Sequence, residues 1–225
     1  MKSGILIAIE GIDGSGKGTQ CRLLYEALCG SGKDVELFQF PQYNSSFFGG
    51  EVGRYLNGEY GQLADVHPKF SALLYALDRF EARDRLIAAI SAGKTVICDR
   101  YTPSNVAHQS ARTEPNIRGE LASWIQHVEY DILSLPKPDI VILLDSTVST
   151  SQTLVSLKDK RIYTDRVHDI QEASDSHLQA ALEAFRNIAI ESNWQVISCL
   201  APDGSLRTPL DIHSELLARV KDSVE

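Results

Sequence analysis

The sequence has little that would suit a membrane or a secreted protein. No apolar run reaches the roughly 18 residues that a membrane-spanning helix needs, and residues 1–3 lead directly into an apolar run without a signal-peptide core. The four cysteines, Cys21, Cys29, Cys98 and Cys199, form no C-x-x-C pair and fall mostly in apolar patterns. That placement favours buried free thiols over disulfides or a metal site. These absences predict a cytoplasmic protein with no membrane partner.

Positive charge is also scarce. The chain has 22 Lys and Arg against 30 Asp and Glu, a net charge of −8, whereas a nucleic acid polymer would favour a basic face. Any phosphate chemistry must therefore use local positive charge. The 225 residues are 43% hydrophobic and 23% charged, with no compositional break, so we expect one α/β domain over residues 1–225.

The most informative stretch is a glycine-rich loop. Gly11 to Lys17 matches the pattern G-x-x-x-x-G-K, after an apolar run at residues 5–9 and before a helical pattern at residues 21–28. The alternative is a glycine-rich turn that contains a lysine by chance. The strand pattern before the loop and the helical pattern after it make that alternative the weaker one. Glycines let backbone N–H groups turn toward one anion, Lys17 adds positive charge, and the helix start adds its dipole. The loop predicts ATP binding by Gly11, Asp13, Gly14, Ser15, Gly16, Lys17, Gly18 and Thr19.

The rest of the chain alternates between strand and helix patterns. Strand candidates lie near residues 5–9, 35–40, 94–98, 139–145 and 194–199, which predicts a parallel sheet with helices on both faces. We expect one helical region over 68–90, with Phe70, Leu73, Leu74, Leu77 and Phe80 facing inward. We expect another over 116–135, with Leu121, Trp124, Ile125, Val128 and Ile132 facing inward.

Three polar or aromatic residues follow the third strand directly. Asp99-Arg100-Tyr101 stands at its carboxyl end, the edge at which parallel sheets bind ligands. Together with the glycine loop and the stretch Leu73 to Glu81 (LLYALDRFE), it makes the chain resemble thymidylate kinases, which belong to the nucleoside monophosphate kinases. The resemblance implies a three-layer P-loop kinase fold with strand order 2-3-1-4-5. It also implies ATP as donor, dTMP as acceptor, Mg²⁺, a place in dTTP biosynthesis and a homodimer.

The resemblance also implies roles for individual residues. Lys17 would hold the ATP phosphates, Asp99 would organise the Mg²⁺ shell, and Arg100 would contact phosphoryl groups between donor and acceptor. On the acceptor side, Asp13 would approach the sugar hydroxyl, Tyr75 would stack on thymine and Arg79 would reach a thymine carbonyl. The other residues expected around the acceptor are Phe40, Tyr101, Ser104, Asn105 and Gln109. Ordinary structural roles stay open: Tyr75 and Tyr101 as core aromatics, Arg79 in an ion pair, and Asp99 as a turn cap.

Two positions depart from the family pattern. Gly18 stands where a hydroxyl usually binds Mg²⁺, so the ion would be held through water or by Thr19. Gln42 and Tyr43 follow Phe40-Pro41, where the family has an arginine. Arg54, Arg79 or Arg83 could take its place.

A charged segment completes the expected site. Residues 158–166 contain Lys158, Lys160, Arg161 and Arg166, and the resemblance implies a lid over about 156–172 with Arg161 and Arg166 as its catalytic cations. A solvated charged surface is the alternative. The acceptor phosphate is already anionic, so positioning and charge neutralisation suffice without a general base. A kinase of another monophosphate or deoxynucleoside, or a non-catalytic nucleotide sensor, remain alternative functions.

Overall fold

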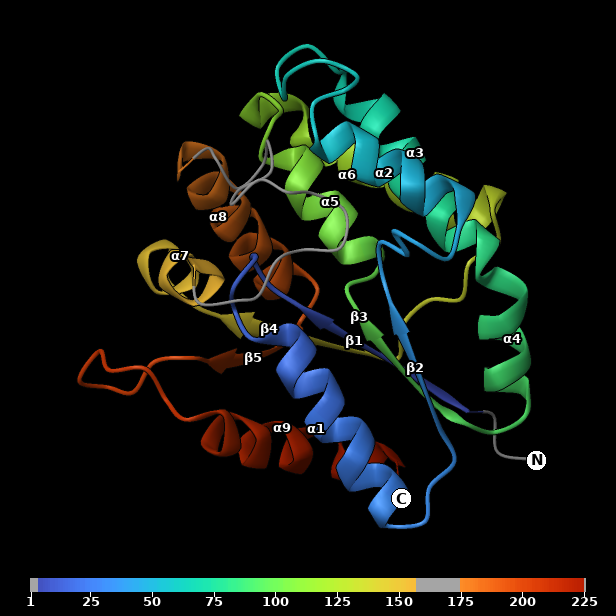
Figure 1. Cartoon of the computed structure of the whole chain (residues 1–225), viewed down its shortest axis with the longest axis vertical. Coiled ribbons are helices and arrows are strands. Elements are labelled where there is room, and N and C mark those ends of the chain that lie inside the picture. Colours follow the sequence, from blue (N-terminus) through green and yellow to red (C-terminus); the bar gives the residue numbers. More distant parts are fainter. Residues whose placement is uncertain (1–3, 157–174, 225) are drawn as a thin grey trace.

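The computed structural model describes residues 4–156 and 175–224, and these form a five-stranded, wholly parallel sheet in the order β2-β3-β1-β4-β5 (Figure 1). The central strand β1 pairs with β3 on one side and β4 on the other, with Ile7 opposite Ile97 and Ile140. The predicted fold class and strand order are confirmed. The strands are β1 (Ile5–Glu10), β2 (Val35–Gln39), β3 (Thr95–Asp99), β4 (Ile140–Asp145) and β5 (Gln195–Ser198).

Helices cover both faces of the sheet (Figure 1). One face carries α1 (Lys17–Gly30) and α9 (Pro209–Val224), and the other carries α4 (Arg83–Ser91), α5 (Thr102–Ser110) and α8 (Asp175–Glu191). The remaining helical elements are α2 (Phe47–Leu56), α3 (Pro68–Glu81), a 3₁₀ turn (Pro115–Ile117), α6 (Arg118–Gln126), a π-helical segment (His127–Ile132) and α7 (Val148–Ser156). In the described residues, no helix is long and apolar enough to cross a membrane.

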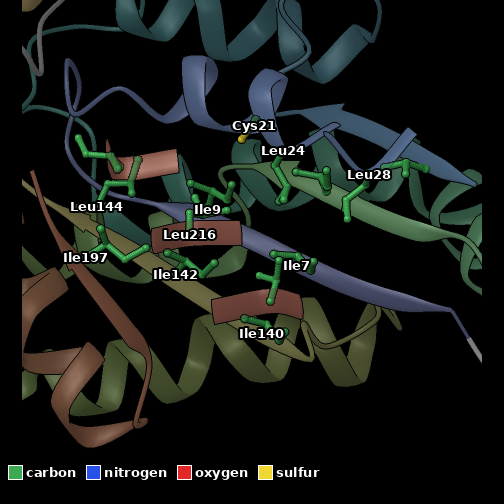
Figure 2. Close-up of a cluster of buried hydrophobic side chains, with 14 of the residues drawn as sticks. Ile7, Ile9, Cys21, Leu24, Leu28, Ile140, Ile142, Leu144, Ile197 and Leu216 are labelled. Atoms are coloured by element: carbon green, nitrogen blue, oxygen red, sulfur yellow. The ribbon is translucent and has the colours of Figure 1, made fainter. Parts of the chain in front are cut away.

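The largest core lies between the sheet and the α1/α9 layer. Figure 2 shows Ile7 and Ile9 of β1 with Leu24 of α1 and Leu216 of α9, all fully buried. All four cysteines lie within the described residues and are free, and only Cys29 is exposed. This apolar layer holds the start of α1 firmly behind the glycine loop.

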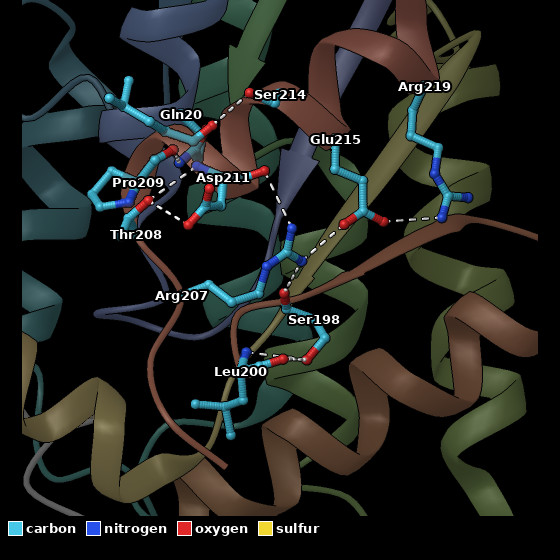
Figure 3. A network of polar contacts seen from close by, with 11 residues as sticks. Gln20, Ser198, Leu200, Arg207, Thr208, Pro209, Asp211, Ser214, Glu215 and Arg219 are labelled. Carbon is cyan, nitrogen blue, oxygen red and sulfur yellow. Dashed lines mark hydrogen bonds and ion pairs between the residues drawn. The ribbon is translucent and has the colours of Figure 1, made fainter. Parts of the chain in front are cut away.

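Polar contacts fasten α9 to α1 and β5 (Figure 3). Arg207 donates to the Ser198 carbonyl and to Glu215, each over 2.8 Å, and Gln20 Nε2 donates to the Pro209 carbonyl over 2.9 Å. Thr208 caps the helix by accepting from the Asp211 N–H over 3.2 Å, and threonine is one of the residue types favoured at helix N-termini.

The expected helical region over 68–90 is divided into α3 and α4, and the expected inward positions of Phe70 and Phe80 are wrong. It breaks at Ala82, whose N–H bonds three residues back to the Arg79 carbonyl and so tightens the end of α3. In addition, Phe70 is 69% exposed and Phe80 36% exposed. The buried face of α3 instead holds small and charged side chains, because it faces α2, α5 and a polar interior. These are Ser71, Ala72, Ala76, Asp78 and Arg79.

The expected inward face of residues 116–135 is wrong at its end. From His127 to Ile132 the helix takes the wider π form, which moves later side chains out of the α-helical phase. Ile132 is 65% exposed, whereas Glu129 is fully buried. The π segment thereby aims a carboxylate at α3 and α5.

Candidate active site

The glycine loop joins the end of β1 to the first turn of α1. Gly11, Gly14 and Gly16 all have positive φ, between 81° and 144°, a backbone shape that other residues rarely adopt. A Cβ atom on Gly14 would come within 2.2 Å of the Ser151 carbonyl oxygen of α7. Glycine is thus required at this point both for conformation and for space. Helix α1 starts at Lys17, so its unpaired N–H groups and positive dipole end lie at the loop.

Lys17 is buried at the loop, with 6% of its surface exposed. Its Nζ donates to the Ile12 carbonyl over 2.8 Å. Burial lowers the pKa of Lys17 to about 8, Arg100 adds to this effect, and Asp13 opposes it. The ammonium therefore stays charged at neutral pH and lies within reach of an anion on the loop.

Arg100 connects the end of β3 to the same loop. Its backbone has φ of 66° and its N–H bonds to the Ile9 carbonyl of β1 over 3.1 Å. Its guanidinium donates to Asp13 Oδ1 at 2.7 Å, to the Gly11 carbonyl at 3.1 Å and to Ser104 Oγ at 3.0 Å. Burial disfavours the Asp13 carboxylate, but the charges of Arg100 and Lys17 outweigh it and hold the pKa of Asp13 well below its usual range.

Asp99 ends β3 beside the first turn of α1. It is 9% exposed, and a Cβ atom on Gly18 would lie 3.2 Å from its Oδ2. A hydroxyl at residue 18 would therefore stand next to this carboxylate. Thr19, the other predicted metal ligand, is exposed on α1. Residues 4–156 and 175–224 contain no group of three or more metal-ligating side chains. One carboxylate beside a phosphate loop nonetheless suits Mg²⁺, which keeps waters and binds substrate phosphates.

A cavity opens beside Arg100 and Asp13, between α2, α3 and α5. Besides Asp13, seven of the residues that we expect to bind the acceptor nucleotide line this cavity: Phe40, Tyr75, Arg79, Arg100, Ser104, Asn105 and Gln109. Tyr75 meets Tyr55 edge to face, with ring centroids 6.5 Å apart. Tyr101 is fully buried in the core instead, where its hydroxyl donates to the Pro136 carbonyl over 2.9 Å. The structure thus brings most of the predicted acceptor residues together and places Tyr101 behind them.

Arg79 has a partner that the sequence pattern does not reveal. Its Nε and NH2 groups donate to the two oxygens of Glu129 over 2.7 and 2.5 Å, and both side chains are almost fully buried. Thr102 and Asn105 also donate to Glu129, each over 2.7 Å. Glu129 therefore accepts four hydrogen bonds, two from Arg79 and one from Asn105, which line the cavity, and one from Thr102.

The residue after Pro41 is the neutral Gln42, which contacts Asp78. The backbone N–H and the Nε2 group of Gln42 both donate to Asp78, and Ser46 Oγ donates to the same carboxylate over 2.6 Å. Arg54 is 60% exposed and pairs with Glu51, and Arg83 pairs with Asp84. Of the three arginines suggested in place of the family's arginine, Arg79 lies in the cavity wall.

Glu10 is a buried polar residue that the sequence pattern did not indicate. Glu10 is fully buried and accepts from the Tyr101 N–H over 2.8 Å and from Ser104 Oγ. Burial raises the pKa of Glu10 to about 7. Its place at the end of β1, the strand that delivers the loop, is the signal that could have revealed it.

Two histidines extend the Arg100 contacts toward α8. Arg100 NH1 lies 3.4 Å from His108 Nε2, and His108 Nδ1 lies 3.4 Å from His177 Nε2. Since a guanidinium only donates, His108 Nε2 accepts and Nδ1 carries the proton. Burial and the Arg100 charge hold the pKa of His108 well below its usual range, and burial lowers that of His177 to about 4. Both rings are neutral at pH 7.

Two amide atoms in the cavity wall are left without hydrogen bonds. Among the contacts of residues 4–156 and 175–224, Asn105 Oδ1 and Gln109 Nε2 are buried and have no partner. Arg161 and Arg166 lie outside the described residues, as does most of the expected lid.

Comparison with known proteins identifies the family. A sequence model described as thymidylate kinase matches residues 9–202. A thymidylate kinase of Mycobacterium tuberculosis is 40% identical over 140 residues, which are 62% of this chain and 65% of that protein. A probable thymidylate kinase of Pyrococcus horikoshii is 33% identical over 222 residues, covering 97% of this chain and 96% of the relative. The chain thus aligns with slightly less than two thirds of the mycobacterial protein, but with nearly all of the archaeal one.

A solved structure shares the fold. A thymidylate kinase structure from Candida albicans superposes with a TM-score of 0.74 at 19% identity, covering 98% of this chain and 92% of that one. The phosphate loop, the Asp99-Arg100 strand end and the family match over most of the chain lead to one conclusion: the chain belongs to the thymidylate kinase family.

Proposed function

We propose that this protein transfers the γ-phosphoryl group of ATP to dTMP and so produces dTDP for dTTP synthesis. The observation that carries the proposal is the meeting of Lys17, Arg100, Asp13 and Asp99 where the glycine loop joins the cavity. A phosphate bound by the loop and a monophosphate in the cavity would face each other there. Family membership supports the same activity and substrate pair.

In the proposed reaction, an oxygen of the acceptor phosphate forms a bond to the γ-phosphorus, and the bond to the β–γ bridging oxygen breaks to release ADP. Lys17 and Arg100 neutralise charge on the phosphates between which the group moves. Asp99 would hold Mg²⁺ through water, with Thr19 as the nearest hydroxyl. The ion would screen the phosphate charge. No side chain has to remove a proton, because the attacking oxygen is already anionic.

On the acceptor side, Tyr75 and Phe40 would flank the base, Asn105, Gln109 and Arg79 would contact its edge, and Asp13 and Ser104 would lie nearer the sugar and phosphate. Tyr101 would act from behind, by holding the ring packing under Phe40, whose centroid is 6.0 Å away. The proposed roles of Arg161 and Arg166 in a lid rest on the sequence.

A coupled assay of ADP release tests the activity directly. With ATP and Mg²⁺, we expect turnover of dTMP, and we expect Lys17→Met to abolish it while circular dichroism stays unchanged. Robust turnover of dCMP, AMP or thymidine without turnover of dTMP would refute the substrate. ATP binding without ADP release for any acceptor would indicate a sensor.

We also propose that the protein forms a homodimer and is cytoplasmic. Exposed apolar side chains on α3 and the π segment, Phe70 and Ile132 at 69% and 65% exposure, suit a covered surface. Light scattering after size-exclusion chromatography tests the homodimer, and a single monomeric mass at micromolar concentration would refute it.

A further inference from the structure

The two unpaired amide atoms lie on one face of α5. Asn105 and Gln109 are four residues apart, so their side chains are neighbours on the helix, and both line the cavity. Asn105 is 3% exposed and Gln109 is fully buried. Buried polar atoms without partners are rare in folded proteins, because each costs the energy of lost hydration. Two of them on one turn of a cavity wall indicate a ligand that supplies the missing partners.

The orientation of the Asn105 amide follows from its neighbours. Its Nδ2 donates to the Ala72 carbonyl over 3.0 Å and to Glu129 Oε1 over 2.7 Å. Rotating the amide by half a turn would set its oxygen against two acceptors. Asn105 Oδ1 is therefore the atom left over, and it is a hydrogen-bond acceptor.

The Gln109 amide has the opposite orientation. Its Oε1 accepts from Ser71 Oγ over 2.8 Å and from Arg112 NH1 over 2.9 Å. The Ser71 contact alone does not fix this orientation. The Ser71 hydroxyl also lies 3.1 Å from the Pro68 carbonyl, so it could donate to that carbonyl and accept from an amide NH₂ group. A guanidinium has only donors. A half-turn of the Gln109 amide would therefore set its NH₂ group against Arg112. Gln109 Nε2 is left over as a donor.

Arg112 is itself held from several sides. The same NH1 group donates to Tyr55 Oη over 2.9 Å, and NH2 donates to the carbonyls of Leu63 and Val66. The guanidinium thus stands fixed at the end of α5, with its NH1 group shared among Tyr55, Ser71 and Gln109. It does not line the cavity that Gln109 lines.

We propose that Arg112 is a positioning residue for base selection: by binding Gln109 Oε1 it keeps Nε2 as an unpaired donor on the face of α5 that also carries the unpaired acceptor Asn105 Oδ1. An acceptor beside a donor complements the N3–H and C4 carbonyl of thymine or uracil. Cytosine presents the reverse, an unprotonated N3 and an amino group. The inference rests on the proposed function in so far as the cavity takes a pyrimidine monophosphate.

Binding of dTMP and dCMP without ATP, measured by calorimetry, tests the inference. The quantity of interest is the preference for dTMP, given by the dissociation constant of dCMP divided by that of dTMP and called the ratio below. We expect wild type to favour dTMP and Arg112→Met to lower the preference by about tenfold or more, the change that follows from one misdirected hydrogen bond. A merely structural loosening would weaken both ligands equally and leave the ratio unchanged. Arg112→Lys, which retains a donor, should preserve part of the preference.

Arg118→Met is the matched control. The Arg118 guanidinium donates to the Thr113 carbonyl over 2.8 Å and lies outside the cavity wall, so its loss should leave the ratio unchanged. Gln109→Glu is a second variant that keeps an oxygen toward Arg112 and replaces the donor by an acceptor. We expect it to lower the ratio at least as much as Arg112→Met.

A folded Arg112→Met protein with a ratio within about twofold of wild type would overturn the inference. If Arg112→Met does not fold, an unchanged ratio in Gln109→Glu overturns it. A wild type without preference for dTMP also refutes it. Wild type that binds dTMP selectively but releases no ADP would refute the proposed activity alone, and the variant ratios would still decide the role of Arg112.

Discussion

Arg100 NH2 donates to Asp13 Oδ1 over 2.7 Å and so ties the end of β3 to the glycine loop of β1. The two strands are neighbours in the sheet, and the pair lies at their carboxyl edge. The contact sets the direction of a guanidinium whose backbone already has a left-handed conformation, with φ of 66°. A phosphate at this edge would therefore meet a charge that is fixed before it binds.

Arg100→Lys should lower kcat by tenfold or more, which corresponds to loss of a transition-state contact of roughly 1.4 kcal/mol. The guanidinium contacts Asp13, Gly11 and Ser104 at once, whereas an ammonium is a single point charge without the planar fork. Steady-state kinetics with dTMP and ATP measure the change, with circular dichroism as the folding control. Wild-type kcat in a folded variant would exclude the proposed role.

Glu10→Gln should change the pH dependence of stability. The folded pKa of Glu10, about 7, lies above its ordinary value of 4.5 because of burial. Its contribution is therefore fully present below pH 4.5 and is lost as the pH rises through 7, roughly 3 kcal/mol in all. Glutamine can accept from the Tyr101 N–H without titrating. The stability of the variant relative to wild type should thus rise by about this amount between pH 4.5 and pH 8.

Urea unfolding at several pH values measures this difference, and subtraction removes the contributions of groups common to both proteins, such as His177. Glu26→Gln is a suitable control, since Glu26 is 55% exposed on α1. A difference between Glu10→Gln and wild type that is constant over this pH range would show that folding does not raise the pKa of Glu10.

Glu129→Gln should lower the free energy of unfolding by about 3–5 kcal/mol, since it removes the carboxylate to which the buried Arg79 guanidinium bonds directly. The double variant Arg79→Met, Glu129→Met should regain part of this loss, because no charge then stays buried. Denaturant unfolding at constant pH measures both. A loss below about 1 kcal/mol for the single variant would contradict the buried ion pair.

Gly14→Ala and Gly30→Ala form a matched pair. Gly14 has φ of 81° and its Cβ atom would collide with the Ser151 carbonyl, whereas Gly30 ends α1 with open space around its Cβ position. We expect the first to cost about 1–2 kcal/mol or more and to weaken ATP binding. We expect the second to stabilise by up to about 1 kcal/mol. Equal melting temperatures and ATP affinities of the two variants would contradict the role of Gly14.

Local patterns predicted much of the fold. The strands at 5–10, 95–99 and 140–145 contain the apolar runs 5–9, 96–98 and 140–144, because both faces of a parallel sheet are covered. The glycine loop was also readable, since its shape follows from glycine conformation and from the helix that starts after it. The strand order was implied by the family resemblance rather than by any pattern in the strands.

Patterns of apolar spacing failed where charged groups are buried. They placed Phe70 and Ile132 inside, although both are largely exposed. The interior positions went to Arg79 and Glu129, which are stable there only as partners. Because those residues are 50 positions apart, neither helix reveals the other, and the π turn that aims Glu129 inward has no clear signature in its residues.

The sequence by itself determined the phosphate loop, the sheet that carries it and the residue types at its edge, because these depend on short-range backbone preferences and apolar periodicity. Tertiary structure alone decided which partners those residues have: Arg79 with Glu129, Gln42 with Asp78, and Arg112 with Gln109. Such pairs depend on long-range packing, in which a hydrogen bond forms only where two distant segments bring a donor and an acceptor within about 3 Å.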